Sequence, residues 1–412
     1  MAAKWETVPL GELTENYDGK RVPVKEIDRR SGTYPYYGAS GIVDHVDGYL
    51  FDGEYLLIGE DGENLRTRQT PIAFMASGKF WVNNHAHIVR GNHRADTKFL
   101  CYALSETDIS GYLTGSTMPK LTQGNLNRIP VIAPPLAKQK RIAEVLGALD
   151  DKIELNRRMN ATLEATARAL FQSWFVDFAP VRAKLDGRTP PEMDAATASL
   201  FPGSFEEASL GHIPKGWETG SILRQADLLS GGTPKTDVPA YWNGDVPWAS
   251  AKDVSQCGEA FLVSTERTIT KLGVEESSTK IIPEFATVVV ARGATTGRLT
   301  MFGHSMAMNQ TCYGLRSKFE APFAIYCHAQ HFVERLVQGG HGSIFDTITT
   351  STFEATDVVL APKEVLLAFN KDVVPLFNQI RTNLHQSHTL ATIRDTLLPK
   401  LLSGELSLKE AA

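Results

Sequence analysis

The chain contains a long internal repeat, and this feature limits the possible folds more than any other. Residues Leu163–Leu170 match residues Leu390–Leu397, which lie 227 positions further on. The match runs without a gap for about sixty residues, which is too long for a solenoid unit or a propeller blade. One large module is therefore used twice. The same offset relates Gly115-Ser116 to Gly342-Ser343, Leu121 to Ile348, Val131 to Val358, Pro135 to Pro362 and Ile153 to Ile380.

Composition narrows the class of protein. A length of 412 residues predicts two or three domains, and an apolar share of 42% is enough for real cores. The net charge of −5 shows no overall basic character, although DNA binding needs only a local basic face. We expect no membrane span and no signal peptide, because no apolar run has the required length. The four scattered cysteines contain no C-x-x-C pair, so we expect a reduced, cytoplasmic protein without disulfides or a structural zinc site.

Turn-rich and helix-rich stretches divide the chain into five segments. Short β-branched or aromatic runs alternate with turns in residues 1–135, and residues 211–362 have the same character. Equivalent starts are visible at Lys4-Trp5-Glu6-Thr7 and Gly216-Trp217-Glu218-Thr219. We predict an α+β fold with two mixed α/β domains and an internal pseudo-two-fold repeat. The remaining segments are a central helix at 136–178, a linker at 179–210, and a second helix with a tail at 363–412, the helix ending before Pro399.

Both predicted helices carry apolar residues in a heptad pattern, which is typical of a coiled-coil seam. Each seam contains one Asn, and we expect these residues to fix the register of an antiparallel pair. Their replacement by Leu should then raise thermal stability and loosen the register. The alternative is that both Asn lie at a wet seam edge. The first stripe consists of Ile142, Leu149, Asn156, Leu163 and Leu170, answered by Phe369, Leu376, Asn383, Leu390 and Leu397. A second stripe consists of Val145/Leu146, Ile153, Met159, Ala167 and Trp174, answered by Val373, Ile380, Ile393 and Leu401.

Helices of this length would make a long spacer. At 1.5 Å per residue, roughly 37 residues span about 55 Å, or about one and a half turns of duplex DNA. Such a pair would hold two globular blocks at a fixed separation.

No catalytic signature is present. Gly231–Thr236 lacks the spacing of a phosphate-binding loop, and the sequence contains no G-x-G-x-x-G, H-E-x-x-H or G-x-S-x-G motif. The Asn/Asp-Pro-Pro-aromatic stretch that amino-group methyltransferases use is also missing. His85 and His87 lie two residues apart and could share a metal, but we expect them to fill hydrogen-bonding positions, and we predict no metal site.

Several polar and aromatic clusters suit nucleic-acid recognition instead. Arg favours guanine in the major groove, and Asn and Gln favour adenine. The alternative is that these residues shape loops and pack against their own block. The candidates in the first block are Tyr36, Tyr37, Ser40, Arg66, Arg68, Gln69, Asn83, Asn84 and His85. Those in the second are Thr233, Lys235, Trp248, Lys252, Arg292, Thr295, Thr296, Arg298, Asn309 and Gln310, with Asn309-Gln310 placed near Asn83-Asn84.

Taken in order, the short motifs of the chain resemble those of the specificity subunits of Type I restriction–modification systems. The resemblance covers nearly the whole sequence. It rests on the duplicated architecture and on Tyr36–Ile42, Val82–His87, Leu170–Phe178, Gly211–Trp217, Gly231–Pro234 and Leu397–Gly404.

The resemblance implies a non-catalytic DNA-binding subunit. Two target recognition domains would each read half of a gapped site in double-stranded DNA. The helices would dock two methylase subunits, which bring S-adenosylmethionine, and a nuclease subunit would bring ATP and magnesium for defence against foreign DNA. One departure is the loop at Arg292–Gly297, whose first-half counterpart, Gly59–Gly62, is acidic. The alternatives are an orphan specificity subunit without a nuclease, a coiled-coil scaffold that holds proteins, and an enzyme with an unrecognised site.

Overall fold

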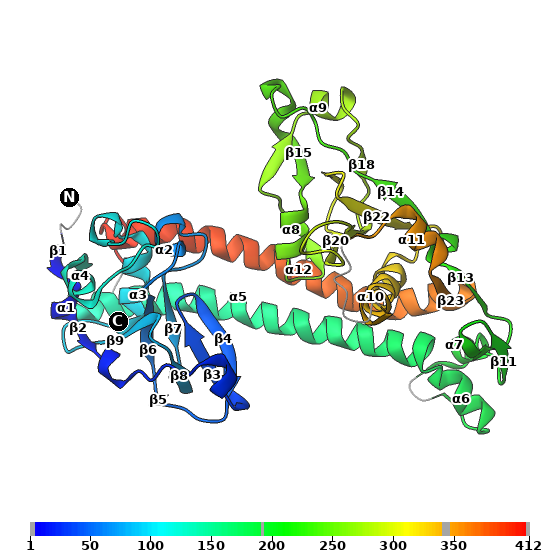
Figure 1. Cartoon of the computed structure of the whole chain (residues 1–412), viewed down its shortest axis with the longest axis horizontal. Coiled ribbons are helices and arrows are strands. Elements are labelled where there is room, and N and C mark those ends of the chain that lie inside the picture. Colours follow the sequence, from blue (N-terminus) through cyan, green and yellow to red (C-terminus); the bar gives the residue numbers. More distant parts are fainter. Residues whose placement is uncertain (1–4, 191–192, 340–346, 409–412) are drawn as a thin grey trace. The chain divides into compact units, whose positions relative to one another are not determined.

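The computed structural model describes residues 5–190, 193–339 and 347–408, which fall into two compact units (Figure 1). The first unit comprises Met1–Ile153 together with His388–Ala412, and the second comprises Glu154–Ser387. The repeat positions Lys4 and Gly342-Ser343 lie outside the described residues.

The first unit consists of two four-stranded sheets, ordered β2-β9-β6-β7 and β4-β3-β8-β5, and a short pair formed by β1 and β10. Strand β6 is central, with Leu56, Leu57 and Ile58 all buried, as expected for a strand covered on both faces. The strands are β1 (Glu6–Pro9), β2 (Thr14–Asn16), β3 (Ser31–Gly38), β4 (Gly41–Val46), β5 (Phe51–Asp52), β6 (Tyr55–Gly59), β7 (Ala73–Ala76), β8 (Lys79–Val82), β9 (Ala86–Gly91) and β10 (Pro130–Ala133). The short helices are α1 (Leu10–Leu13), α2 (Asn64–Thr67), α3 (Thr97–Glu106) and α4 (Gln123–Arg128).

The second unit has a five-stranded sheet, β14-β22-β19-β20-β16, a four-stranded sheet, β17-β15-β21-β18, and two strand pairs, β11-β12 and β13-β23. Its strands are β11 (Phe205–Ala208), β12 (Gly211–Pro214), β13 (Glu218–Ser221), β14 (Ala226–Ser230), β15 (Trp242–Ala249), β16 (Phe261–Leu262), β17 (Arg267–Ile269), β18 (Ile281–Ile282), β19 (Thr287–Val290), β20 (Leu299–Phe302), β21 (Met306–Met308), β22 (Cys312–Ser317) and β23 (Asp357–Leu360). Its shorter helices are α6 (Ala179–Leu185), α7 (Ala195–Ser199), α8 (Ala251–Gln256), α9 (Lys271–Glu275), α10 (Pro322–Gly339) and α11 (Thr350–Ala355).

The two units repeat one topology. The pair β1-β10 corresponds to β13-β23, and the sheet β2-β9-β6-β7 corresponds to β14-β22-β19-β20. A parallel pair also recurs at corresponding places: Tyr36 of β3 lies opposite Trp81 of β8, and Trp248 of β15 lies opposite Ala307 of β21. The second unit has a further parallel pair, β16 with β20. The internal repeat predicted from the sequence is therefore confirmed, and it extends through the globular parts.

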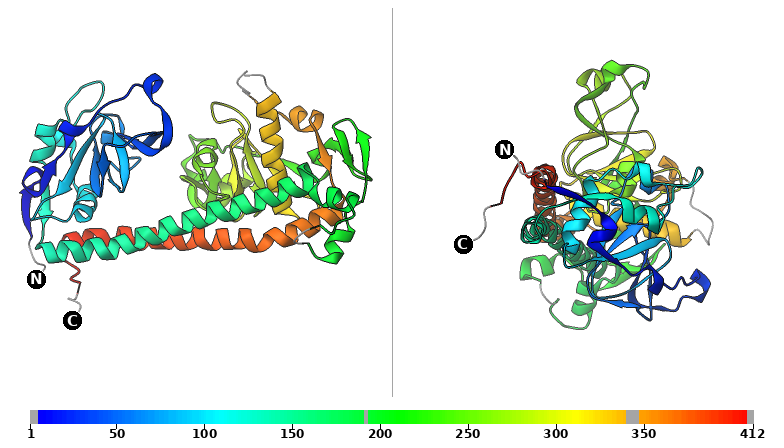
Figure 2. Two further views of the ribbon diagram at one scale, coloured as in Figure 1. Left: turned by 90° about the horizontal axis from the view of Figure 1, so that it is seen from below. Right: turned by 90° about the vertical axis from the view of Figure 1, so that its left-hand side faces the viewer.

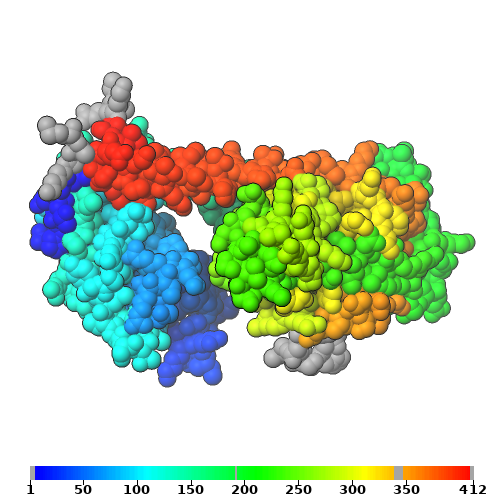
Figure 3. All heavy atoms as spheres, turned by 90° about the horizontal axis from the view of Figure 1, so that it is seen from above, coloured from blue at the N-terminus to red at the C-terminus, as the bar shows by residue number. Residues whose placement is uncertain are grey.

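Two long helices, α5 (Leu136–Phe171) and α12 (Lys363–Leu402), run antiparallel within each unit (Figure 2). In the first unit Ile142 and Leu146 share an apolar cluster with Leu398 and Leu401. The red end of α12 lies against the cyan part of this unit in Figure 3. In the second unit Ala167 and Phe171 belong to one cluster with Phe369 and Val373.

A polar contact anchors the helix pair inside the first unit. Arg394 of α12 lies 2.7 Å from Asp150 of α5, and the hydroxyl of Tyr102, on α3, donates a hydrogen bond to the same carboxylate. Burial, together with the hydrogen bond to Asp150, raises the pKa of Tyr102. The second unit uses a related device, because the buried Tyr326 of α10 donates to Glu164 of α5 at 2.6 Å.

Asparagines fill the seam between α5 and α12 in the second unit. The side-chain amide of Asn156 donates to the backbone oxygen of Asn383 at 3.3 Å and to Gln386 at 2.9 Å. Asn383 in turn donates to Asn160 at 2.9 Å. Asn156, Asn160 and Asn383 are all at least 96% buried. The alternative of a wet seam edge is therefore wrong.

The heptad assignment is correct in part. Ile142, Asn156, Phe369 and Asn383 are fully buried, whereas Met159 and Ile393 of the second stripe are exposed. A straight α-helix drifts about 20° per heptad, so a strict seven-residue pattern loses the buried face over several turns. The other members of the first stripe, Leu149, Leu163, Leu170, Leu376, Leu390 and Leu397, are half-buried.

Three predicted boundaries differ from the structure. Helix α5 passes into a π-helical turn at Gln172–Val176, and α12 continues through Pro399 to Leu402. The predicted linker at 179–210 contains α6, α7 and β11, and its Val181 and Phe201 are buried in the second unit's core. A high proline content marked this segment as a linker, but apolar residues between the prolines fix it to the core.

Candidate nucleic-acid interface

The turn after β8 in the first unit matches the turn after β21 in the second. The N–H of Asn83 donates to the Tyr37 carbonyl at 3.0 Å, and its side-chain oxygen accepts from the His85 N–H at 2.8 Å. Asn309 makes the corresponding pair of bonds at 2.9 Å and 3.2 Å. The predicted correspondence between these two asparagines is thus confirmed, and both have a structural role.

A second matched pair of loops follows β6 and β19. The N–H of Glu60 donates to the His85 carbonyl, in the turn after β8, at 2.8 Å, and the Glu60 carbonyl accepts from the Leu121 N–H at 2.7 Å. Ala291 makes the same two backbone bonds, each at 2.8 Å. The next residues, Asp61 and Arg292, are therefore equivalent positions of opposite charge. The loops that begin at Glu60 and at Ala291 therefore have the same backbone hydrogen bonds but different side chains.

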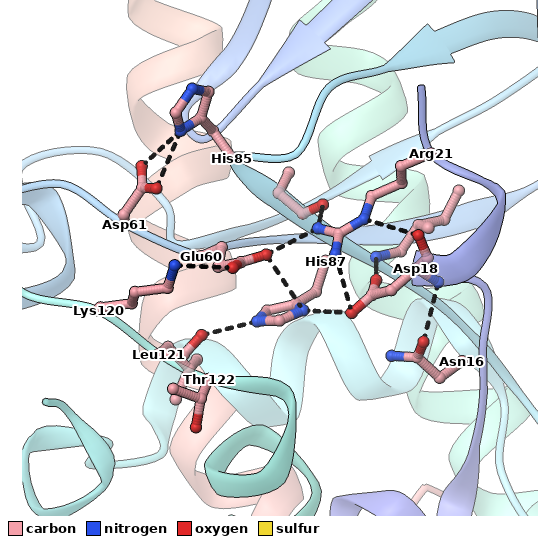
Figure 4. Close-up of polar contacts among 12 residues, drawn as sticks. Asn16, Asp18, Arg21, Glu60, Asp61, His85, His87, Lys120, Leu121 and Thr122 are labelled. Carbon is pink, nitrogen blue, oxygen red and sulfur yellow. Dashed lines mark hydrogen bonds and ion pairs between the residues drawn. The ribbon is translucent and has the colours of Figure 1, made fainter. Parts of the chain in front are cut away.

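A buried polar network lies behind these loops in the first unit (Figure 4). His87 is 1% exposed, and its Nδ1 lies 2.5 Å from Asp18 while its Nε2 lies 2.7 Å from the Leu121 carbonyl. Both partners are acceptors, so both contacts are hydrogen bonds only when both ring nitrogens carry protons. Arg21 donates to Glu60 at 2.8 Å and closes the network.

The carboxylates of this network are neutralised by neighbouring cations. Burial alone raises the pKa of Asp18, but the hydrogen bond and charge of His87, with smaller contributions from the Ile88 N–H and Arg21, bring it below its usual value. Glu60 has a second cation, Lys120, at 3.3 Å. The network fixes the loop after β6 against β9.

Asp61 and His85 form a separate pair at the surface, also visible in Figure 4. Nδ1 of His85 lies 3.0 Å and 2.9 Å from the two carboxylate oxygens of Asp61. The prediction that His85 and His87 occupy hydrogen-bonding positions is confirmed.

Some of the predicted DNA-contact residues of the first unit are exposed, and others have structural roles. Tyr36 is buried, with its hydroxyl accepting from the Val24 N–H at 3.0 Å, so its role is structural and the prediction that it contacts DNA is wrong. Arg68 donates to the Ser105 and Thr107 carbonyls and thereby holds its own loop. Arg66 is exposed but donates to the Gly115 carbonyl at 3.0 Å. Ser40, Gln69, Asn84 and His85 are exposed, and Tyr37 is half-buried.

The second unit shows the same division. Trp248 is buried and its indole N–H donates to the Gly232 carbonyl at 3.0 Å, so it too is structural. Lys252 is exposed but forms an ion pair with Glu266 at 2.8 Å. Thr233 donates to the side chain of Gln310. Lys235, Arg292, Thr295, Arg298 and Gln310 are exposed, and Thr296 and Asn309 are half-buried.

Some residues that build the site were missed from the sequence. The guanidinium of Arg267 stacks 3.5 Å from the centre of the Trp242 ring, and that of Arg29 lies 4.5 Å from the Tyr36 ring. Asp18, Arg21 and Lys120 were also missed. These residues are far from their partners in sequence, and their spacing forms no motif. The only sequence feature that could have pointed to them was a charged residue close to a predicted aromatic loop.

Residues suited to chemistry are few in the described part of the chain. It contains no group of three or more His, Cys, Asp or Glu side chains placed to hold a metal ion. Burial raises the pKa of Cys101 and of Cys312 to about 12, so neither thiol ionises readily. Burial lowers the pKa of His328 to about 3. Within the same described residues, no helix is both long and apolar enough to span a membrane.

Comparison with known proteins agrees with this arrangement. The family described as the Type I restriction modification DNA specificity domain matches residues 3–165 and 214–374. The Type I restriction enzyme HindI specificity subunit of Haemophilus influenzae is 28% identical over 411 residues, covering 86% of this chain and 84% of that protein. The MjaIX specificity subunit of Methanocaldococcus jannaschii is 24% identical and covers 98% and 94%. The crystal structure of a Type I S subunit from M. genitalium has the same fold, with a TM-score of 0.58 at 14% identity and 96% coverage of both chains.

Proposed function

The chain belongs to the Type I restriction–modification DNA specificity family, and from this premise we propose that it reads a gapped, two-part sequence in double-stranded DNA for an adenine methylase. Each of its two target recognition domains reads one half of the site.

The observation that supports this proposal is that the two units share one backbone arrangement but carry different side chains on it. Asn83 and Asn309 hold equivalent turns, but the residues that follow are Asn84 and His85 in one unit and Gln310 and Thr311 in the other. Side chains of this kind differ in the base edges that they match. A repeated scaffold with changed tips is suited to reading two different half-sites.

The positions of the exposed cations support the division of labour between phosphate and base contacts. Lys235, Arg292 and Arg298 are exposed on the second unit, and we propose that they bind phosphates. In the first unit the equivalent of Arg292 is acidic, so its phosphate contacts must come from elsewhere, for example from the exposed Lys25.

The partners are also proposals. The paired helices α5 and α12 are proposed to set the gap between half-sites and to dock two methylase subunits, which carry S-adenosylmethionine. A nuclease subunit that uses ATP and magnesium is proposed to complete the restriction complex. In this scheme the chain itself binds no cofactor and catalyses no reaction.

Base-modification sequencing of genomic DNA tests the proposal directly. Cells that contain the methylase partner are compared with and without this chain. Adenine methylation at one gapped, two-part motif, present only with the chain, is the expected result. A methylation pattern that does not depend on the chain would refute the proposal, and a pull-down would then show which proteins it holds as a scaffold.

A further inference from the structure

The Asp61–His85 pair has the geometry of a fixed hydrogen-bonding group at a surface. The backbone of His85 is held at both ends, because its N–H donates to the Asn83 side chain at 2.8 Å and its carbonyl accepts from the Glu60 N–H at 2.8 Å. Its ring is held by Asp61 through Nδ1. The side chain nevertheless remains 53% exposed.

The chemistry of Asp61 determines which ring nitrogen carries the proton. A carboxylate only accepts hydrogen bonds, so the nitrogen facing it, Nδ1, must be the donor. In the neutral ring Nε2 is then an acceptor with a free lone pair. Within the described residues no hydrogen bond to this nitrogen is present. In this neutral form His85 presents a single acceptor of defined direction.

The surroundings favour a base edge rather than a phosphate as the partner of this acceptor. Asp61 carries a negative charge next to the ring, and a phosphate placed there would be repelled. His85 and Asn84 line a pocket of about 400 Å³ whose wall includes Lys25 and Arg29. Lys25 is exposed and can bind an adjacent phosphate, whereas Arg29 is already paired with Asp44 at 3.1 Å.

We propose that Nε2 of His85 reads an exocyclic amino group, that of adenine or cytosine, at one position of the half-site bound by the first unit, and that Asp61 positions it by fixing the tautomer. Adenine N6 and cytosine N4 are the amino donors in the major groove, whereas guanine and thymine present acceptors at the corresponding edges. This inference rests on the proposed function and names the residue that carries part of it.

Within the residues that the structure describes, the second unit lacks an equivalent of the Asp61–His85 pair. Arg292 stands at the position of Asp61, and Thr311 at the position of His85. The two units therefore cannot use this device in common, and the second half-site serves as an internal control in the same complex.

The test uses the full chain with its methylase, and the readout is the methylated motif in genomic DNA. Asp61→Asn leaves an amide that can accept from Nδ1 or donate to it, so both tautomers become available. One position of one half-site should then admit all four bases, with a loss of about tenfold discrimination, while the other half-site is unchanged. His85→Arg, which only donates, should shift the same position towards guanine.

Glu106→Gln is the matched control, because Glu106 is an exposed carboxylate at the end of α3 in the same unit, and it should leave the motif unchanged. Unchanged motifs in both the Asp61→Asn and His85→Arg complexes overturn the inference while the proposed function stands. If Asp61→Asn abolishes methylation, His85→Ala decides: a relaxed single position supports the inference, and an unchanged motif overturns it. If the wild-type chain directs no gapped motif, the proposed function itself fails.

Discussion

Three buried asparagines set the register of the helix pair in the second unit. Asn156, Asn160 and Asn383 are linked to each other and to Gln386 by side-chain and backbone hydrogen bonds of 2.9–3.3 Å. A sliding of one helix by a single turn would separate all these partners. Polar groups within an otherwise apolar seam thus determine how the helices pair. Single asparagines fix the register of coiled coils in the same way.

The sequence predicted that leucine in place of Asn383 would raise stability. The hydrogen bonds of Asn383 predict the opposite. Asn383→Leu should lower the free energy of unfolding by about 1–3 kcal/mol, because it leaves the buried Asn160 oxygen without its donor. Urea unfolding followed by circular dichroism measures this. Asn378→Leu makes the same change at an exposed position of α12 and should cost much less. A gain in stability for Asn383→Leu would show that the bonds contribute nothing net.

The network around His87 should make the first unit sensitive to acid. The pKa of Asp18 is lowered in the folded state, so its stabilisation is present above about pH 4 and is lost as the pH falls through the lowered value. Asp18→Asn should cost about 2–4 kcal/mol at pH 7, because His87 loses its charged partner, and should flatten the acid limb of the stability curve. Urea unfolding at pH 7 and at pH 3 measures both effects. If the stability of Asp18→Asn falls with acid as steeply as that of the wild type, other groups cause the acid sensitivity. Glu106→Gln is the control.

The two long helices show what an element's sequence does and does not reveal. The heptad pattern predicted a coiled-coil seam and the burial of Ile142 and Phe369, and the matched seam asparagines predicted an antiparallel pair. It did not reveal Asn160, because a polar residue gives no signal of burial in a hydrophobic pattern. The continuation of α12 through Pro399 was also missed, since a proline normally argues for a helix end.

Helix α12 also contains Pro375, an exposed proline well inside the helix. Proline removes the backbone hydrogen bond to the residue four positions earlier and crowds its carbonyl. Pro375→Ala should therefore raise the free energy of unfolding by about 1–3 kcal/mol. Thermal or urea unfolding measures the gain, with Lys371→Ala, at an exposed position one turn earlier, as the control. No gain would mean that the backbone around Pro375 is already relaxed.

At the scale of the whole molecule, the repeat in the sequence predicted the architecture well. Leu121 and Ile348, which the repeat pairs, donate equivalent backbone hydrogen bonds in the two units. The recognition surfaces were less predictable, because exposure depends on tertiary contacts. Tyr36 and Trp248 looked like binding residues but are buried, while the half-buried Asp61 gains its partner, His85, from a turn 24 residues away.

The modular build gives a prediction for the whole complex. Replacing residues 6–133, from β1 to β10, with the equivalent block of a relative should change one half-site of the methylated motif and leave the other intact. Replacing residues 218–360 should do the reverse. Sequencing of methylated adenines reports both, and a single exchange that alters both halves would contradict independent reading by the two units.

The first unit is assembled from two distant stretches of the chain, and this affects the order of events during synthesis. Residues 154–387 emerge from the ribosome as a continuous unit, whereas the apolar cluster of the first unit includes Leu398, Leu401 and Leu402. Domains fold as units while the chain is being made, so the second unit can complete its core before the first. The part of the chain that is translated first is the part whose fold is finished last, and translation that stops after Ser387 leaves one completed recognition domain and one still open.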